Sequence, residues 1–212
     1  MRTGSDTSCT PADLAAAYPD VTVSLHQGSP DQVARMVIEE TAEIGMATES
    51  LANYPELVTL PCYEWQHVLV LPKNHPLAGV KQITLERLQE HPLVTYHPSF
   101  TGRSRIDQAF AHQGLTPQIA LEAIDSDVIK TYVSLGMGVG VVAEMAVQDG
   151  LSEALISRPA GKLFGTNTAR VAFKRGSYLR HFVLEFAQML SNRLSRDLVL
   201  KALEGRHTDY EL

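Results

Sequence analysis

The 212-residue sequence predicts an α/β fold. Two observations carry this prediction. Short apolar runs that suit β-strands alternate with stretches of helical apolar period, and several of these pairs have a strand–loop–helix form. In open parallel sheets, ligands bind where helix N-termini follow the carboxyl ends of strands. The loops at residues 27–30, 99–103 and 125–127 have this form and are the first places to look for a site.

The first half of the chain holds a helix with a complete start signal. Ser29 suits the N-cap, Pro30 suits the first helical position, and Gln32 completes a capping box. Later, Thr84 can cap a short helix that runs through Glu90. The strands expected in this half cover residues 21–25, 43–48, 57–60, 62–65, 67–71 and 92–96.

The second half continues the alternation of helices and strands. Ser126 can cap a helix that stops at Gly136, and Ser195 can cap a last helix through Leu203. Residues 148–168 are polar and marked by Gly and Pro, which predicts loops with one short extended stretch. The other expected elements are helices over 103–112 and 177–194 and strands over 118–123, 139–143 and 169–173.

Composition and charge limit the classes of partner. Lysine and arginine number 18 against 24 aspartates and glutamates, a formal net charge of −6, so DNA or anionic lipid binding by bulk charge is not expected. The two cysteines, Cys9 and Cys62, cannot build a disulfide framework and favour a reducing compartment. No apolar run approaches the roughly 20 residues of a spanning helix, and residues 1–10 form a polar leader rather than a secretory signal. We therefore expect a cytoplasmic protein with no membrane partner.

Motifs for catalysis or metal binding are incomplete. The glycine-rich run at 136–140 follows a helix and opens a strand, the reverse of a dinucleotide-binding loop. No nucleophile elbow or phosphate loop occurs, and the eight histidines lack metal-ligand spacing. Cys62 could be a nucleophile or a small buried apolar residue; the second is favoured because no basic neighbour would activate it. We expect no catalytic residue, metal or cofactor, and a binding protein rather than an enzyme.

Hydroxyl groups gather around the expected start of the helix near Arg103. Ser99, Thr101 and Ser104 carry hydroxyls, and Gly102 lets a ligand approach the backbone closely. Such a place can hold a small anion with backbone N–H groups and hydroxyls. The alternative is that Thr101 only caps its helix.

Two further residues have a double interpretation. Thr48 ends an expected strand, and it strengthens the anion site only if the fold brings it to Thr101. Trp65 is the single tryptophan of the chain. It is a core residue by default, and its place after Tyr63 and Glu64 also permits a position in the wall of a cleft.

Six runs of residues together resemble the effector-binding domain of LysR-type transcriptional regulators. They look specifically like the CysB/Cbl branch, which controls sulfur assimilation and cysteine biosynthesis. The resemblance covers about residues 18–203 and implies two Rossmann-like subdomains joined by two crossing strands, as in type-2 periplasmic binding proteins. The strands at 67–71 and 169–173 supply the crossings. The runs are HQGSP (26–30), ATE (47–49), LPCYEW (60–65), HPLAG (75–79), FTGRS (100–104) and DVIKTYV (127–133).

The resemblance also divides the chain. Subdomain I is expected over residues 11–69 and 171–205, and subdomain II over 70–170, followed by a polar tail at 206–212. Members of the family pair through a helix of one subdomain and a strand of the other. The resemblance therefore implies a homo-oligomer, in which the helix near 11–17 would take part.

A cleft between the subdomains is implied as well. It would bind a small anionic effector of the sulfate, thiosulfate or acetylserine class. Thr48 and Thr101 match the family's anion-binding threonines, and Trp65 matches its cleft tryptophan. Gly102 and Arg103, at the same helix start as Thr101, are the other expected ligand-binding residues.

Two features of the family are missing from the sequence. Its members begin with a winged helix–turn–helix, so this chain alone should not bind an operator, and promoter DNA is expected as a partner only through that absent part. The family's first effector-domain strand carries a Thr- and Gln-bearing motif that contributes to the anion site, and residues 1–10 do not match it. A periplasmic-type solute-binding protein for a small anion is the alternative function.

Overall fold

The computed structural model describes residues 11–205, and the chain falls into two compact units. We call residues 11–63 with 168–205 the terminal unit, and residues 64–167 the central unit. Each unit has a buried apolar cluster on both faces of its strands. The expected α/β class is therefore confirmed by the arrangement of helices on strands.

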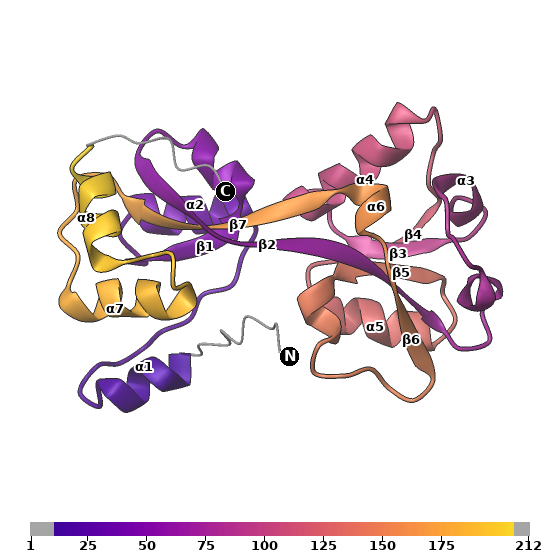
Figure 1. Cartoon of the computed structure of the whole chain (residues 1–212), viewed down its shortest axis with the longest axis horizontal. Helices are drawn as coiled ribbons and strands as arrows, with labels where there is room; N and C mark the ends of the chain where they lie inside the picture. Colours follow the sequence, from indigo (N-terminus) through magenta and orange to yellow (C-terminus); the bar gives the residue numbers. More distant parts are fainter. Residues whose placement is uncertain (1–10, 206–212) are drawn as a thin grey trace. The chain divides into compact units, whose positions relative to one another are not determined.

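Two long strands are divided between the units, β2 (Leu57–Pro72) and β7 (Thr166–Lys174), and Figure 1 labels both. The strands that were expected as crossings, at 67–71 and 169–173, lie within β2 and β7. The units change at 63/64 and 167/168, whereas the expected boundaries at 69/70 and 170/171 lie a few residues further on. The expected leader, residues 1–10, and tail, residues 206–212, lie outside the described residues.

The terminal unit has the strand order β1-β7-β2. β1 runs antiparallel to β7, with Thr48 opposite Ala169. The side chains of β7 alternate between the faces of the sheet: Val171 and Phe173 pack with α7 and α8, and Ala172 packs with α2 and η1. The remaining elements of the unit are α1 (Pro11–Ala17), α2 (Pro30–Ile38), β1 (Gly45–Thr48), the 3₁₀ helix η1 (Glu49–Asn53), α7 (His181–Leu190) and α8 (Arg196–Leu203).

The central unit has a mixed sheet. β5 and β6 both run antiparallel to β2, whereas β3 is parallel to β4 and to β5. The elements are η2 (Pro76–Gly79), α3 (Leu85–Leu88), β3 (Leu93–Tyr96), α4 (Thr101–His112), β4 (Ile119–Ala123), α5 (Ser126–Ser134), β5 (Val139–Ala143), η3 (Glu144–Val147), β6 (Leu155–Pro159) and α6 (Gly161–Phe164).

Helices cover both faces of the central sheet, α4 on one and α5 on the other (Figure 1). Alternation along β2 assigns the faces, because Leu69 packs with Ile106 of α4 and Val70 packs with Ile129 of α5. These buried contacts fix where the two helices begin relative to the ends of β3 and β4. No helix among the described residues has the length and apolar character that a membrane crossing requires.

Three of the four predicted helix caps form, whereas Asp125 rather than Ser126 caps α5. Ser29 Oγ accepts the N–H of Gln32 at 3.4 Å, and Gln32 Oε1 accepts the N–H of Ser29 at 2.8 Å. The hydroxyl of Thr84 accepts the N–H of Arg87 at α3, and that of Ser195 accepts the N–H of Leu198 at α8. Each cap supplies an acceptor for an N–H group that has no partner inside the helix.

The strand expected over 21–25 does not form. Its alternation of apolar and polar residues is real, but an extended segment becomes a strand only when a neighbour completes the hydrogen-bond ladder. Within the described residues, no strand pairs with this segment. The N–H of Val21 instead bonds to the carbonyl of Tyr18 at 3.0 Å, which closes a turn after α1.

Three other elements differ in length or content from those that the sequence predicts. The pieces at 57–60, 62–65 and 67–71 form one strand, because Pro61 removes a single N–H donor and its fixed φ still fits extended backbone. The region 148–168, expected as loops with one extended stretch, contains β6, α6 and the start of β7. β6 is secured by Arg158, whose guanidinium donates to the backbone carbonyls of the chain before α3. The helix expected over 177–194 is the shorter α7.

Candidate functional site

The carboxyl edge of the central sheet gathers the residues of interest. β3 leads into α4 and β4 leads into α5, so both helices begin at this edge. β2 runs antiparallel to β5, with His67 opposite Ala143, the last residue of β5. The part of β2 that carries Trp65 and His67 therefore lies at the same edge as the start of α4.

The start of α4 has no side-chain cap. The N-cap position is occupied by Phe100, and Thr101 is the first helical residue. The alternative that Thr101 serves only as the cap is therefore wrong, and the helix starts two residues earlier than expected. The hydroxyl of Ser104 donates to the carbonyl of Thr101 at 2.7 Å, and the Ser99 hydroxyl lies 3.0 Å from His97 Nδ1. Both neighbouring hydroxyls thus have protein partners.

Gly102 lies against two aromatic rings. A Cβ atom at this position would stand 3.1 Å from Trp65 Cη2 and 3.1 Å from His67 Nε2. The absence of a side chain was expected to admit a ligand, but the space is filled by these rings of the same chain. Gly102 is a buried residue, and its backbone N–H has no hydrogen-bond acceptor among the described residues. It remains a donor that a bound anion can use.

His67 is the residue that the sequence interpretation missed. Its side chain is fully buried and lies edge-on between Trp65 and Phe164, with ring centroids 5.0 Å and 5.5 Å away. Its Nδ1 is 3.5 Å from the side-chain amide nitrogen of Asn167, another fully buried residue. A histidine at the start of the apolar run of β2 was the available signal. This buried polar pair fixes the ring that Gly102 contacts.

Arg103 does not face open solvent. Its guanidinium donates to Asp107 at 2.8 Å, to Glu122 at 2.7 Å and to the carbonyl of Tyr96 at 3.1 Å. Burial acts to lower its pKa, but the hydrogen bonds to Asp107 and Glu122 outweigh it and leave the pKa raised. The side chain therefore connects the first turns of α4 to the ends of β3 and β4.

Thr48 belongs to the terminal unit, whereas the other four expected site residues belong to the central unit. It is the last residue of β1 and the N-cap of η1, and its hydroxyl lies 3.3 Å from the Ser50 hydroxyl. The next residue, Glu49, accepts the backbone N–H of Thr168 at 3.3 Å. The central unit thus brings Trp65, Thr101, Gly102 and Arg103 together at one edge.

The chemistry of these groups favours binding. Backbone N–H groups, hydroxyls and aromatic rings surround the start of α4, and the Arg103 guanidinium is engaged by carboxylates. The Ser99 hydroxyl lies beside His97 Nδ1, and that nitrogen also accepts the backbone N–H of Ser99 at 3.2 Å. Cys62 is buried in the terminal unit, where burial raises its thiol pKa to about 11. Such a thiol stays protonated at neutral pH. Among residues 11–205, no group of three His, Cys, Asp or Glu side chains could hold a metal ion.

Comparison with known proteins assigns a family to this arrangement. Residues 12–195 match the family described as the LysR substrate binding domain. The chain belongs to this family. It is 48% identical to the HTH-type transcriptional regulator CysB of Burkholderia cenocepacia over 201 residues, which cover 95% of this chain and 64% of that protein. It is 41% identical to the regulator cbl of Escherichia coli over 198 residues, which cover 92% and 63%.

A solved LysR structure agrees with the fold. The cofactor-binding domain of the Cbl transcriptional regulator superposes with a TM-score of 0.85 at 40% identity, and the match covers 91% of this chain and 84% of that one. The chain spans less than two thirds of the length of the CysB and cbl relatives and matches their effector-binding region. These relatives are named as transcriptional regulators, which does not favour the solute-binding alternative.

Proposed function

We propose that the chain is the effector-binding domain of a CysB-like regulator of sulfur assimilation and cysteine biosynthesis, and that its effector is a small sulfur-related anion or an acetylserine-type molecule. One observation carries the proposal: the uncapped start of α4 leaves the N–H of the buried Gly102, beside Trp65, without an acceptor among residues 11–205. Such a regulator binds its ligand without converting it and works in the cytoplasm.

The physical terms at this helix start favour an anion of modest affinity. The helix dipole contributes about 0.3–1 kcal/mol for an exposed anion and more for a partly buried one. Each neutral hydrogen bond adds about 0.5–1.5 kcal/mol. Asp and Glu are absent from the first turn of α4. Weak reversible binding is suited to a sensor that must follow the concentration of a metabolite.

Each predicted ligand-binding residue has a separate part in this proposal. The hydroxyl of Thr101 and the N–H of Gly102 donate to the anion, and Trp65 shapes the wall. Arg103 keeps the helix start in place through its carboxylate partners. Thr48 is included because it matches an anion-binding threonine of the family, and its contribution is tested by substitution.

Titration calorimetry with sulfate and thiosulfate tests the assignment. We expect the wild type to bind, and Thr101→Ala and Thr48→Ala each to weaken binding. Thr116→Ala, an exposed threonine of the central unit, is the matched control and should bind as the wild type does. If both site variants keep wild-type affinity, the anion binds elsewhere and the assignment is wrong.

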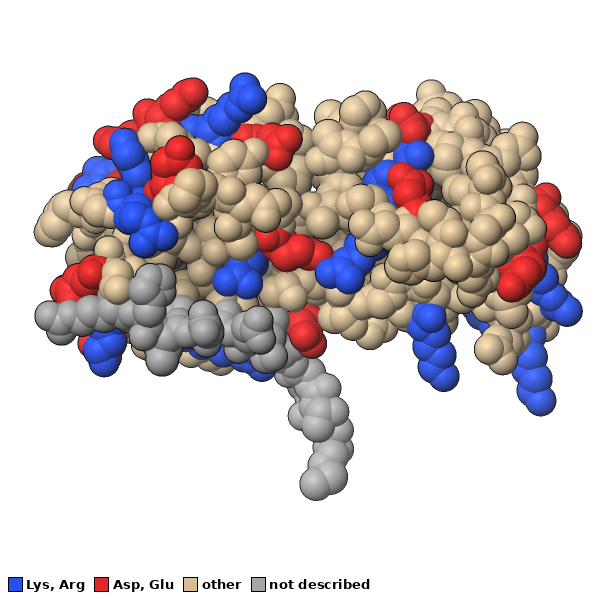
Figure 2. All heavy atoms as spheres, turned by 90° about the horizontal axis from the view of Figure 1, so that it is seen from above, with Lys and Arg blue, Asp and Glu red and all other residues tan. Residues whose placement is uncertain are grey.

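We also propose that promoter DNA is contacted through a helix–turn–helix outside this chain. On the face shown in Figure 2, acidic and basic side chains are interspersed and form no broad basic field on the residues described. Phosphate binding by proteins relies on such basic surfaces. A promoter fragment should therefore not be retarded specifically by this chain alone, and salt-sensitive, sequence-selective retardation would refute this part.

Self-association is the last part of the proposal. β4 is the edge strand of the central sheet, and an apolar stripe lies exposed beside it. The stripe consists of Ile124, Val128, Tyr132 and Leu135. An open edge next to exposed apolar side chains is suited to a second copy of the chain.

Sedimentation velocity tests this part. We expect Leu135→Arg to dissociate an oligomer, while Leu25→Arg, a change at an equally exposed leucine of the terminal unit, leaves it intact. A wild type that remains monomeric at high concentration would contradict self-association.

A further inference from the structure

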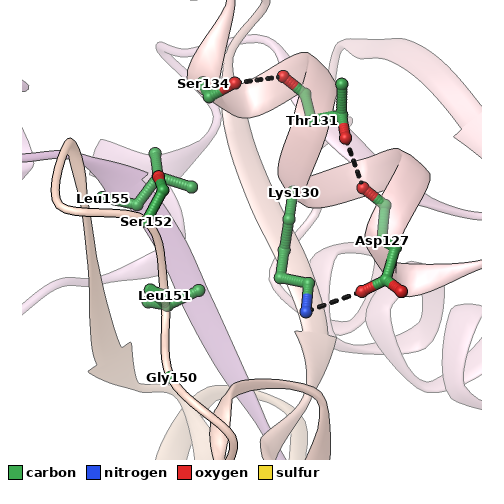
Figure 3. Close-up of a pocket in the computed structure, with 8 residues that line it drawn as sticks. All are labelled: Asp127, Lys130, Thr131, Ser134, Gly150, Leu151, Ser152 and Leu155. Atoms are coloured by element: carbon green, nitrogen blue, oxygen red, sulfur yellow. Dashed lines mark hydrogen bonds and ion pairs between the residues drawn. The ribbon is translucent and has the colours of Figure 1, made fainter.

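A pocket of about 230 Å³ lies in the central unit, beside α5. One side is formed by the α5 face that carries Asp127, Lys130 and Thr131, and the other by the loop at Gly150–Ser152 (Figure 3). It does not share a lining residue with the start of α4. Three of its residues, Asp127, Lys130 and Thr131, belong to the run 127–133, and the proposed function gives these three no role.

Lys130 is held in a fixed position in this pocket. Its ammonium donates to the carbonyl of Ala146 at 2.8 Å and pairs with the carboxylate of Asp127 at 2.7 Å. Only 21% of the Lys130 side chain is exposed, against 81% of that of Asp127. An ammonium has three N–H donors, so one donor remains after these two contacts. A surface lysine of an ordinary helical ion pair is not restrained in this way.

Hydroxyls supply further polar groups around the pair. The Thr131 hydroxyl donates to the carbonyl of Asp127 at 2.8 Å and that of Ser134 donates to the carbonyl of Thr131 at 2.6 Å, so both retain acceptor lone pairs. Opposite them, the hydroxyl and the backbone N–H of Ser152 have no partner within residues 11–205. The N–H of Leu151 also lacks one.

The size and charge of the pocket select a class of ligand. The volume of about 230 Å³ lies below the roughly 300–1,000 Å³ of sites for drug-sized ligands, so the pocket suits a small molecule. A positive and a negative side chain lie together at the wall, and the apolar Leu155 lines the pocket as well. We propose that this pocket binds a small zwitterionic amino acid, with its carboxylate toward Lys130 and its ammonium toward Asp127.

The Lys130 ammonium and the Asp127 carboxylate already stabilise each other as an ion pair. A zwitterion can place an opposite charge beside each of them while this ion pair stays intact. Its affinity is expected in the millimolar range, because both protein charges are partly solvated. An anion alone would meet the Asp127 carboxylate, and a cation alone would meet the Lys130 ammonium. Selectivity for a zwitterion over either singly charged analogue is therefore the signature of the site.

Amide chemical-shift mapping of the full chain with L-serine as the probe tests this inference. We expect saturable shifts at Thr131, Leu151 and Ser152. Glycerate, which lacks the ammonium, and serinamide, which lacks the carboxylate, should bind about tenfold more weakly.

Variants separate this pocket from the start of α4. Lys130→Met should lower serine affinity about tenfold. Asp127→Asn should do the same at an exposed position that tolerates the change. Lys81→Met, at an exposed lysine of the same unit, and Thr101→Ala should leave the affinity unchanged. Absence of saturable shifts at these amides, equal binding of the three probes, or wild-type affinity in Asp127→Asn would each overturn the inference.

Discussion

The central unit contains two helices that begin at the same edge of one sheet, and their starts differ in whether a side chain caps them. α4 follows β3 and α5 follows β4, and the two strands are parallel neighbours. The start of α5 is closed by its own chain, because the Asp125 carboxylate accepts the N–H of Asp127 at 2.6 Å. The start of α4 has Phe100 in the equivalent position, which offers no acceptor.

Under the proposed function, this difference means that topology alone does not make an anion site. Both helices direct N–H groups and the positive end of a dipole toward the edge of the sheet. At α5 a capping carboxylate and a second acidic residue in the first turn occupy that field. At α4 the first turn carries no acidic residue, and the N–H of Gly102 has no acceptor among the described residues. The residue before each helix therefore decides whether a side chain caps its start.

Giving α4 the cap of α5 should have the largest effect on anion binding. In Phe100→Asp, the new carboxylate would accept the N–H groups of the first turn and repel an anion. We expect sulfate and thiosulfate affinity to fall by about tenfold or more, while the cap itself stabilises the helix by about 1 kcal/mol. Titration calorimetry and urea denaturation measure the two effects.

The control for this change is Phe100→Ala. It removes the ring, whose centroid lies 6.0 Å from that of Tyr96, without adding a cap. Binding should persist in this variant. Wild-type affinity in Phe100→Asp would show that the anion does not sit at the start of α4.

Sequence analysis could locate this edge because its signals are local. A strand, a loop with hydroxyls and a glycine, and a helix follow one another in residues 93–112, and their order predicts the site. His67 was not predicted, because its role depends on the pairing of β2 with β5, which brings residues far apart in the chain together. For the same reason, the sequence could not show that Arg103 would be engaged by Glu122.

In the fold as well, features that depend on neighbouring residues could be predicted, and features that depend on distant parts of the chain could not. Caps such as Ser29 and Ser195 were predicted correctly, since each involves residues three positions apart. The segment 21–25 was predicted as a strand from its alternation, but strand formation depends on a neighbour that alternation does not reveal. β2 was divided into three pieces because its polar residues interrupt the pattern, although the backbone continues through them.

Gly102→Ala should disturb the open helix start next most strongly. The new Cβ would stand 3.1 Å from the rings of Trp65 and His67, both buried in β2, and overpacking of this kind costs up to about 3 kcal/mol. In an unobstructed helix, a change from Gly to Ala raises the free energy of unfolding by about 0.5–1 kcal/mol. A lower free energy of unfolding in Gly102→Ala would therefore show that the rings obstruct the new Cβ.

Urea denaturation measures the free energy of unfolding for this comparison. Gly79→Ala is the matched control, since nothing lies within 4 Å of the Cβ position there. Equal stability of the two variants would mean that the rings move aside at no cost. The contact between β2 and the start of α4 would then not be rigid.

Arg103→Met should have a smaller effect on stability. It distinguishes a residue that holds the start of α4 in place from one that contacts the ligand. The substitution leaves the carboxylates of Asp107 and Glu122 without their guanidinium, and each remains partly accessible to water. We expect a loss of about 2 kcal/mol in the free energy of unfolding. Arg87→Met, at an exposed arginine of α3, should change stability little. If anion affinity falls while stability does not, Arg103 contacts the ligand directly.

Asp125→Ala should produce the smallest effect on stability. It tests the comparison by removing the cap from α5. The change removes the acceptor of the Asp127 N–H and leaves the helix start uncapped, at a cost of about 1 kcal/mol. Asp125→Asn keeps an acceptor oxygen and should restore most of that stability in urea denaturation. Opening α5 in this way should not create a second anion site, because Asp127 still places a negative charge in the first turn. Sulfate titration of Asp125→Ala with a second equivalent bound would show that the missing cap alone makes such a site.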